Sequence, residues 1–192
     1  MKKVFILVVI YSCVLTHSFG QINWGYKAGV NNSIIFNSSH NDFTSNTKFN
    51  TGVISKIKLV KEYFLNLECL YSIKGYNTEL IPSGKNTINL SYLTLPILIE
   101  LRTTNKFYFQ FGTELNYLVA AKIKDNTNEG SVLDKYNKFD ISIAGGICYY
   151  ISKKLGLETR YVFGLSQINQ RPDIFGSEYN RTFQVNLIYL FK

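Results

Sequence analysis

Apolar and aromatic residues occupy every second position over much of the chain between Trp24 and Phe191. Such alternation is typical of a β-strand with one apolar and one polar face. The last segment shows it most simply, with Phe183, Val185 and Leu187 on one face and Gln184 on the other. The pattern recurs in eight segments: 24–31, 49–59, 63–74, 92–101, 107–119, 139–149, 155–166 and 182–191.

The connections between these segments alternate in length. After the second, fourth and sixth segments the chain turns within a few residues, at 60–62, 102–106 and 152–154. After the others it runs through long polar stretches, for example 32–48 and 121–137. Periplasmic turns and longer extracellular loops are typical of outer-membrane barrels. We therefore predict an all-β protein, an eight-stranded antiparallel up-and-down transmembrane β-barrel.

Pro96 lies in the fourth segment and has no N–H to donate to a strand ladder. A closed barrel has no edge strand in which a proline is easily accommodated. We therefore predict a β-bulge near Pro96.

The first twenty residues are typical of a secretory signal peptide, since Lys2 and Lys3 precede an apolar run over 4–15 and a small-residue approach to Gly20. The run is too short for a membrane-spanning helix. Cleavage after Gly20 predicts a signal peptide over 1–20 and one barrel domain over 21–192, located in the cell outer membrane. Lipidation at Cys13 is the alternative.

Composition agrees with a barrel. The mean hydropathy of -0.01 is low for a membrane protein, but only alternate residues of a barrel strand face lipid. Without residues 1–20 the chain keeps 19 basic and 13 acidic residues, a net charge of +6. The basic residues are scattered, which argues against nucleic acid. Outer-membrane lipid and surface polysaccharide are the expected partners for this charge.

Ten charged residues fall on the polar faces of the predicted strands. An eight-stranded barrel is only wide enough to be filled by side chains, so we predict that they pair as an interior polar plug. A proton or ion path is the alternative interpretation. The ten are Lys27, Lys56, Lys58, Glu68, Lys74, Glu100, Glu114, Asp140, Glu158 and Arg160.

The two cysteines after the signal peptide, Cys69 and Cys148, fall on opposite faces of segments that are not adjacent. A disulfide requires the two Cα atoms to approach within about 7 Å. We therefore predict that both are free.

Catalysis finds little support in the sequence. His17 belongs to the signal peptide, and His40 lies in the first long loop with Ser38, Ser39 and Asp42. These four residues could form the catalytic site of an acyl-chain hydrolase, which needs a histidine beside a serine or an acid. An Asn/Ser-rich loop is the simpler interpretation, so no enzyme is predicted.

No cofactor or metal is predicted either. The stretch 125–130 resembles the start of a calcium loop, but Tyr136 stands where an EF-hand needs a bidentate glutamate. No Cys/His spacing indicates zinc.

Aromatic residues gather near the segment ends assigned to the periplasm, which predicts an interfacial girdle. Its expected members are Trp24, Tyr26, Tyr63, Phe64, Phe107, Tyr108, Tyr149, Tyr150, Tyr189 and Phe191. The terminal residues 189–191 are also similar to the signal read by the barrel-assembly machinery, an expected partner during insertion, although Lys192 follows them.

Three stretches resemble the PorT-like outer-membrane β-barrel proteins of Bacteroidetes-type bacteria. They are Gly25-Tyr-Lys-Ala-Gly29-Val-Asn31, Ser91-Tyr92-Leu-Thr-Leu-Pro96-Ile-Leu, and Leu155-Gly-Leu-Glu158-Thr-Arg160-Tyr161 followed by Gly164-Leu165. Thr94 departs from the family, which often has an acidic residue there. The resemblance implies an eight-stranded outer-membrane barrel, and a few members are tied to protein secretion.

We therefore predict a small non-enzymatic outer-membrane barrel with a structural, adhesive or secretion-accessory role, and secretion-system components as possible partners. A soluble exported eight-stranded barrel that binds an apolar ligand is an alternative, with the same alternation turned inside out. Glycines on the polar face favour a narrow interior over a solvated surface.

Overall fold

The computed structural model describes residues 22–37, 43–80, 84–125, 129–171, 173 and 176–191. The predicted signal peptide, 1–20 with Cys13, lies outside these residues. A short strand β6 (Glu129–Ser131) and a 3-10 helix η1 (Leu133–Lys135) lie between the fifth and sixth long strands. The long strands are β1 (Ile22–Asn37), β2 (Phe43–Val60), β3 (Tyr63–Leu80), β4 (Gly84–Arg102), β5 (Phe107–Lys124), β7 (Phe139–Tyr150), β8 (Leu155–Gly164) and β9 (Glu178–Leu190).

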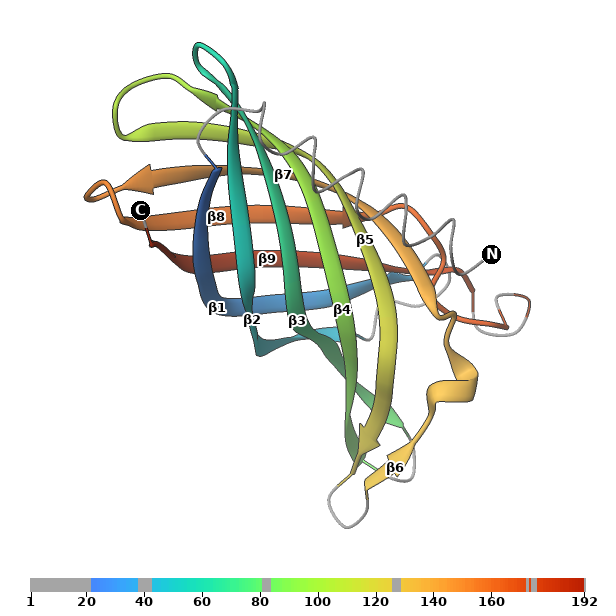
Figure 1. Ribbon diagram of the computed structural model, residues 1–192. Coiled ribbons are helices and arrows are strands. Elements are labelled where there is room, and N and C mark those ends of the chain that lie inside the picture. The colour runs from blue at the N-terminus through green and yellow to red at the C-terminus, as the bar shows by residue number, and fades with distance from the viewer. Residues whose placement is uncertain are drawn as a thin grey trace, which may run out of the picture.

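The long strands form one closed sheet (Figure 1). Each pairs antiparallel with the next long strand in the chain, and β1 pairs with β9 to complete the circle. The small β6 adds three residue pairs to the far end of β5. The closed eight-stranded antiparallel barrel confirms the predicted fold class. In the part of the chain that the structure describes, no helix is long and apolar enough to cross a membrane.

The two ends of the barrel differ. The short turns 61–62, 103–106 and 151–154 share one end, here called the short-turn end, as the sequence predicts. At the opposite, long-loop end, several strands run much further than the alternation indicates. The predicted loop 32–48 is largely paired, for example Asn32 with Thr47 and Ser33 with Asn46. Backbone pairing needs no apolar side chains, so the ladder continues where the alternation stops.

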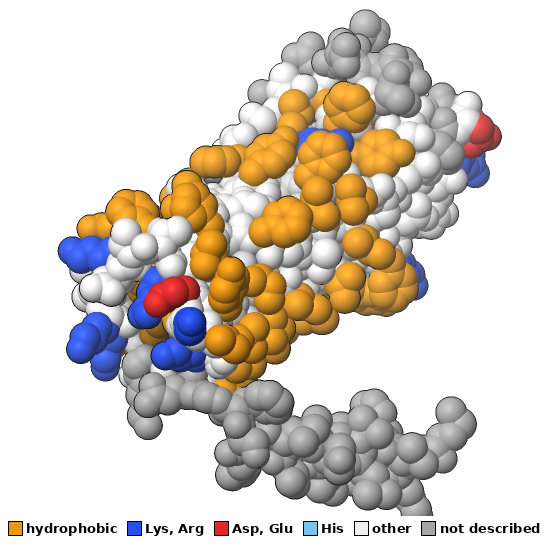
Figure 2. All heavy atoms as spheres, turned by 90° about the horizontal axis from the view of Figure 1, so that it is seen from above, with side chains coloured by type: hydrophobic (Ala, Val, Ile, Leu, Met, Phe, Trp, Pro, Cys, Tyr) orange, Lys and Arg blue, Asp and Glu red, His pale blue; other side chains and the backbone are white. Residues whose placement is uncertain are grey.

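The sides of the barrel are apolar and its interior is largely polar. Leu95, Leu115 and Leu187 are exposed on the outer face, and hydrophobic side chains line the flank seen in Figure 2. Arg160 and Gln184 are buried inside. The soluble ligand-carrier alternative requires the reverse arrangement and is therefore wrong.

The bulge predicted near Pro96 is not found. Leu67 lies opposite Ile97 and Leu70 opposite Thr94, so the register between β3 and β4 is the same on both sides of the proline. Pro96 itself pairs with Glu114 on β5. The barrel accommodates the missing N–H by a local gap in one ladder instead of an inserted residue. The register shift in β4 lies at Ser91 and Tyr92, on the β5 side.

Both described cysteines are free, as predicted, with Cys69 exposed on the outer face and Cys148 buried inside the barrel.

An apolar cluster closes the barrel interior near the long-loop end. Tyr76 and Tyr136 belong to this cluster, and their hydroxyl oxygens are hydrogen-bonded to each other at 2.8 Å. Burial raises the pKa of Tyr136 to about 12. The segment that carries Tyr136 is held across the opening by backbone bonds, including Asn137 N to Ile168 O at 2.7 Å. This segment, with Val132 and Ile168, therefore acts as a packed cap on the interior.

Candidate functional site

Arg160 on β8 stands at the centre of the barrel interior and binds three carboxylates. Its guanidinium donates to Glu68 on β3 at 2.7 and 3.1 Å, to Glu158 at 3.0 Å and to Glu114 on β5 at 3.5 Å. Lys27 on β1 completes the cluster with Glu68 at 2.6 Å and Glu158 at 2.9 Å. All five side chains are buried, and together they tie four strands of the barrel to one another.

A second ion pair lies between this cluster and the short-turn end. Lys56 pairs with Glu100, and Gln110 donates to the same carboxylate at 2.8 Å. Asn66 connects the two clusters because its amide donates to Glu68 at 2.9 Å and to Glu100 at 3.2 Å. The charges thus belong to one hydrogen-bonded network, which raises the cost of removing any member.

Towards the long-loop end the network thins out. Lys74 lies 3.8 Å from Glu114 and donates to Asn116 at 3.2 Å. Thr94, the departure from the PorT-like pattern, donates to the same Asn116 at 2.8 Å. Asp140 is not part of the central cluster, and it accepts hydrogen bonds from Ser166 and Asn180 instead.

Nine of the ten charged residues assigned to the interior are buried there, four cations and five carboxylates. Lys58 is the exception, since it is exposed at the short-turn end. It shares the face of Lys56 but lies two residues nearer the rim, where the β2–β3 ladder loses its register. Three buried amides, Asn66, Gln110 and Asn186, also belong to the interior. Their place on the polar face is the one signal of this in the sequence, and it does not separate them from other polar residues there.

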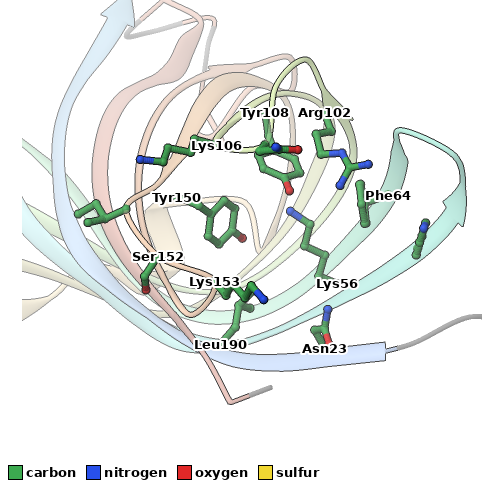
Figure 3. A pocket seen from close by; sticks show the side chains of 13 residues that line it. Asn23, Lys56, Phe64, Arg102, Lys106, Tyr108, Tyr150, Ser152, Lys153 and Leu190 are labelled. Atoms are coloured by element: carbon green, nitrogen blue, oxygen red, sulfur yellow. The ribbon is translucent and has the colours of Figure 1, made fainter.

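A cavity of about 590 Å³ opens at the short-turn end (Figure 3). Its floor is formed by Phe64, Tyr108 and Tyr150, whose rings surround the Lys56 ammonium at 4.8, 3.7 and 4.6 Å from their centroids. Favourable cation–π contacts occur at these distances. The other lining residues are Asn23, Lys58, Arg102, Asn105, Lys106, Ile151, Ser152, Lys153 and Leu190.

The aromatic floor corrects part of the predicted girdle. Tyr63, Phe107 and Phe191 are exposed on the outside as expected, but Phe64, Tyr108 and Tyr150 face inward. Of the other expected members, Tyr149 is half-buried and Trp24, Tyr26 and Tyr189 are exposed. The signal was present in the sequence, because 63–64, 107–108 and 149–150 are consecutive aromatic pairs and neighbours in a strand face opposite sides.

Basic side chains gather at this end of the barrel, at the lower left of Figure 2. Lys58, Lys106 and Lys153 are exposed there. Glu62 is exposed in the β2–β3 turn, where a hydrogen bond and the positive charge of Arg102 lower its pKa. Among the described residues, none that lines the cavity is acidic.

The remaining candidate residues from the sequence are the His40 loop and the calcium-like stretch. His40 with Ser38, Ser39 and Asp42 lies outside the described residues, as does part of the calcium-like stretch. Within the described ranges, no group of three His, Cys, Asp or Glu side chains is placed to hold a metal ion.

Two of the solved structures that share this fold match over most of the chain. Neisserial surface protein A matches with a TM-score of 0.56 and 9% identity, over 88% of this chain and 99% of that chain. Ail, the attachment invasion locus protein of Yersinia pestis, matches with a TM-score of 0.53 and 11% identity, over 90% of this chain and 100% of that chain. No curated protein matches the chain significantly in sequence.

The family model described as "Outer membrane protein beta-barrel domain" matches residues 16–170, most of the chain. The match agrees with the closed barrel, its apolar flank and its charged interior. The protein therefore belongs to the outer membrane protein beta-barrel domain family, and its location is the outer membrane.

Proposed function

We propose that this protein is a non-enzymatic scaffold that presents its long-loop end outside the cell for adhesion. The observation on which the proposal rests is the filled interior. The ion-pair network crosses the middle of the barrel, and the packed cap lies beyond it towards the long loops. Such an interior suits a rigid support better than a pore, because a water-filled lumen would solvate these charges separately.

The long-loop end offers the surface to be presented. β3, β4 and β5 continue past the capped barrel to β6, and this extension is visible at the bottom of Figure 1. Loops and exposed strands held on a rigid support are where binding residues are commonly found. The excess of basic over acidic residues favours an anionic surface polysaccharide as the partner.

The motifs shared with the PorT-like proteins support assignment to that subgroup, and with it the orientation in which the short turns face the periplasm. The same resemblance supports a secretion-accessory role as the second candidate.

Adhesion is tested on cells that display the full chain. The hairpin 77–87 is replaced by an Asn-Gly turn between Tyr76 and Ile88, which lie directly opposite each other. Binding to immobilised sulfated polysaccharide should fall because part of the presented surface is removed, while the amount in the outer membrane and the heat-dependent gel shift stay unchanged. A neutral polysaccharide of the same length is the control for charge.

Equal binding by the wild type and by variants trimmed at each long loop would refute the adhesive function. Steady ion conductance by the purified barrel in a planar bilayer would refute the filled scaffold on which it depends.

A further inference from the structure

We propose that the cavity at the short-turn end binds a phosphate-bearing anion. Lys58, Lys106 and Lys153 would hold the charged group, and the rings of Tyr108 and Tyr150 would contact its less polar part.

The lining of the cavity is strongly asymmetric in charge. Over the ranges that the structure describes, five cationic side chains and no carboxylate line its volume of about 590 Å³. This size is ordinary for small-molecule sites. A concave site lined by one sign of charge concentrates ions of the opposite sign. The ligand should therefore be an anion.

The cations divide into two groups by their partners. Lys56 is held by Glu100 and by the aromatic floor, and Arg102 is held by Glu62. No ion pair joins Lys58, Lys106 or Lys153 to a carboxylate of the described residues. Lys106 Nζ lies 5.9 Å from the centroid of the Tyr149 ring, a weak contact, and the charge of Lys58 contributes to the lowered pKa of Glu62. These three lysines, here called the rim lysines, are the cations that a ligand can engage most easily.

The rim lysines come from different sides of the barrel. Lys58 is on β2, Lys106 is in the β4–β5 turn and Lys153 is in the β7–β8 turn. Figure 3 shows Lys106 and Lys153 on opposite sides of the opening with Tyr150 between them. The Lys106 ammonium lies near the Tyr149 ring instead of over the opening. Because a lysine side chain is flexible, the three ammonium groups can turn to reach one anion in the opening from several directions.

Phosphate is the chemistry that fits this arrangement. Lysine acts on phosphate as a point charge with rotatable donors, so several lysines neutralise its charge without a fixed planar geometry. The Ser152 hydroxyl and the Asn105 amide add neutral donors to the same lining. The group can belong to a soluble phosphorylated molecule or to the headgroup of an anionic lipid, because exposed aromatics near this end indicate a membrane interface.

The test uses the full chain refolded in dodecyl maltoside and titrated calorimetrically with pyrophosphate. The variant K58Q/K106Q/K153Q should bind roughly tenfold or more weakly than the wild type, given three small electrostatic contributions. K124Q/K135Q/K138Q is the matched control, since it removes the same charge from exposed positions near the long-loop end. A heat-dependent gel shift verifies that each variant is folded.

A second arm distinguishes the source of the phosphate. Each protein is extracted from membranes that contain phosphatidylglycerol and weighed intact by native mass spectrometry. A lipid retained by the wild type and the control, but not by the rim variant, identifies a headgroup as the ligand. Pyrophosphate binding without retained lipid identifies a soluble one.

Two outcomes would overturn the proposal. One is equal weakening of pyrophosphate binding in the rim and control variants, because the effect would then reflect net charge alone. The other is a wild type that binds neither pyrophosphate nor phosphatidylglycerol.

Discussion

Replacing Arg160 with Met tests the interior network at its centre. The wild-type interior balances four of the predicted cations against five carboxylates, all buried. In Arg160→Met three cations face the same five carboxylates, and Glu68 loses both of its guanidinium bonds. Met fills much of the vacated space, so the charge imbalance is the main change.

The expected loss of stability follows from two bounds. Breaking a buried ion pair by removing one partner costs about 3–5 kcal/mol. The barrel can instead protonate one orphaned glutamate, which at pH 7 costs about 3.7 kcal/mol for an ordinary pKa of about 4.3. We therefore expect Arg160→Met to lower the free energy of unfolding by about 3–4 kcal/mol at pH 7. Protonation becomes easier in acid, so the difference from the wild type should shrink to about 1 kcal/mol at pH 5.

Urea unfolding in phosphatidylcholine vesicles measures this, with the fluorescence of the single tryptophan, Trp24, as the signal. Adding Glu68→Gln to Arg160→Met should recover part of the loss, because it removes one unpaired carboxylate. Arg102→Met, at an exposed ion pair, should have little effect. Equal stability of Arg160→Met and wild type at pH 7, or a further loss in the double variant, would show that Arg160 does not hold these carboxylates in balance.

Three further predictions address packing, the cap and the outer face. Gly112→Ala should destabilise the barrel by about 1–3 kcal/mol in the same urea assay, because the new Cβ would overlap the Ile97 carbonyl oxygen and lie 2.8 Å from Leu98 Cα. Gly130→Ala should be neutral, because its new Cβ would meet no atom nearer than 3.9 Å. Tyr136→Phe should cost about 0.5–1.5 kcal/mol through its lost bond to Tyr76, and an unchanged unfolding midpoint would count against the packed cap. Leu187→Arg, on the outer face, should lower the free energy of unfolding in vesicles by about 2–4 kcal/mol, while Val60→Arg at the end of β2 should lower it little. Similar losses at the two positions would contradict a position of Leu187 deeper in the membrane than Val60.

The sequence predicts the middle of each strand well and its ends poorly. Where one face meets an apolar surround and the other a polar interior, the residues alternate, as in 183–187. Beyond that zone both faces are polar, so nothing in residues such as Asn32 or Ser33 marks the strand that continues through them. Pro96 misled for a related reason, since a ladder can lose one bond without a change of register.

The cavity at the short-turn end was not predicted because both members of each aromatic pair were assigned to the outer girdle. Alternation predicts that one member of each aromatic pair faces inward, but treating both as girdle residues concealed Tyr108 and Tyr150. Lys58 and Lys56 share a face, and only their depth, which depends on strand tilt and register, separates the rim from the buried network. The buried pairings themselves, such as Arg160 with Glu68, join strands β8 and β3 and require the three-dimensional arrangement.

The most direct measurement is the gel mobility, with and without heating, of the full chain recovered from fractionated cells. The protein should sediment with the outer membrane and migrate as a compact band that shifts on boiling, since a closed hydrogen-bonded barrel resists detergent until heated. Recovery as a soluble periplasmic protein, or an outer-membrane protein whose mobility is the same before and after heating, would contradict it.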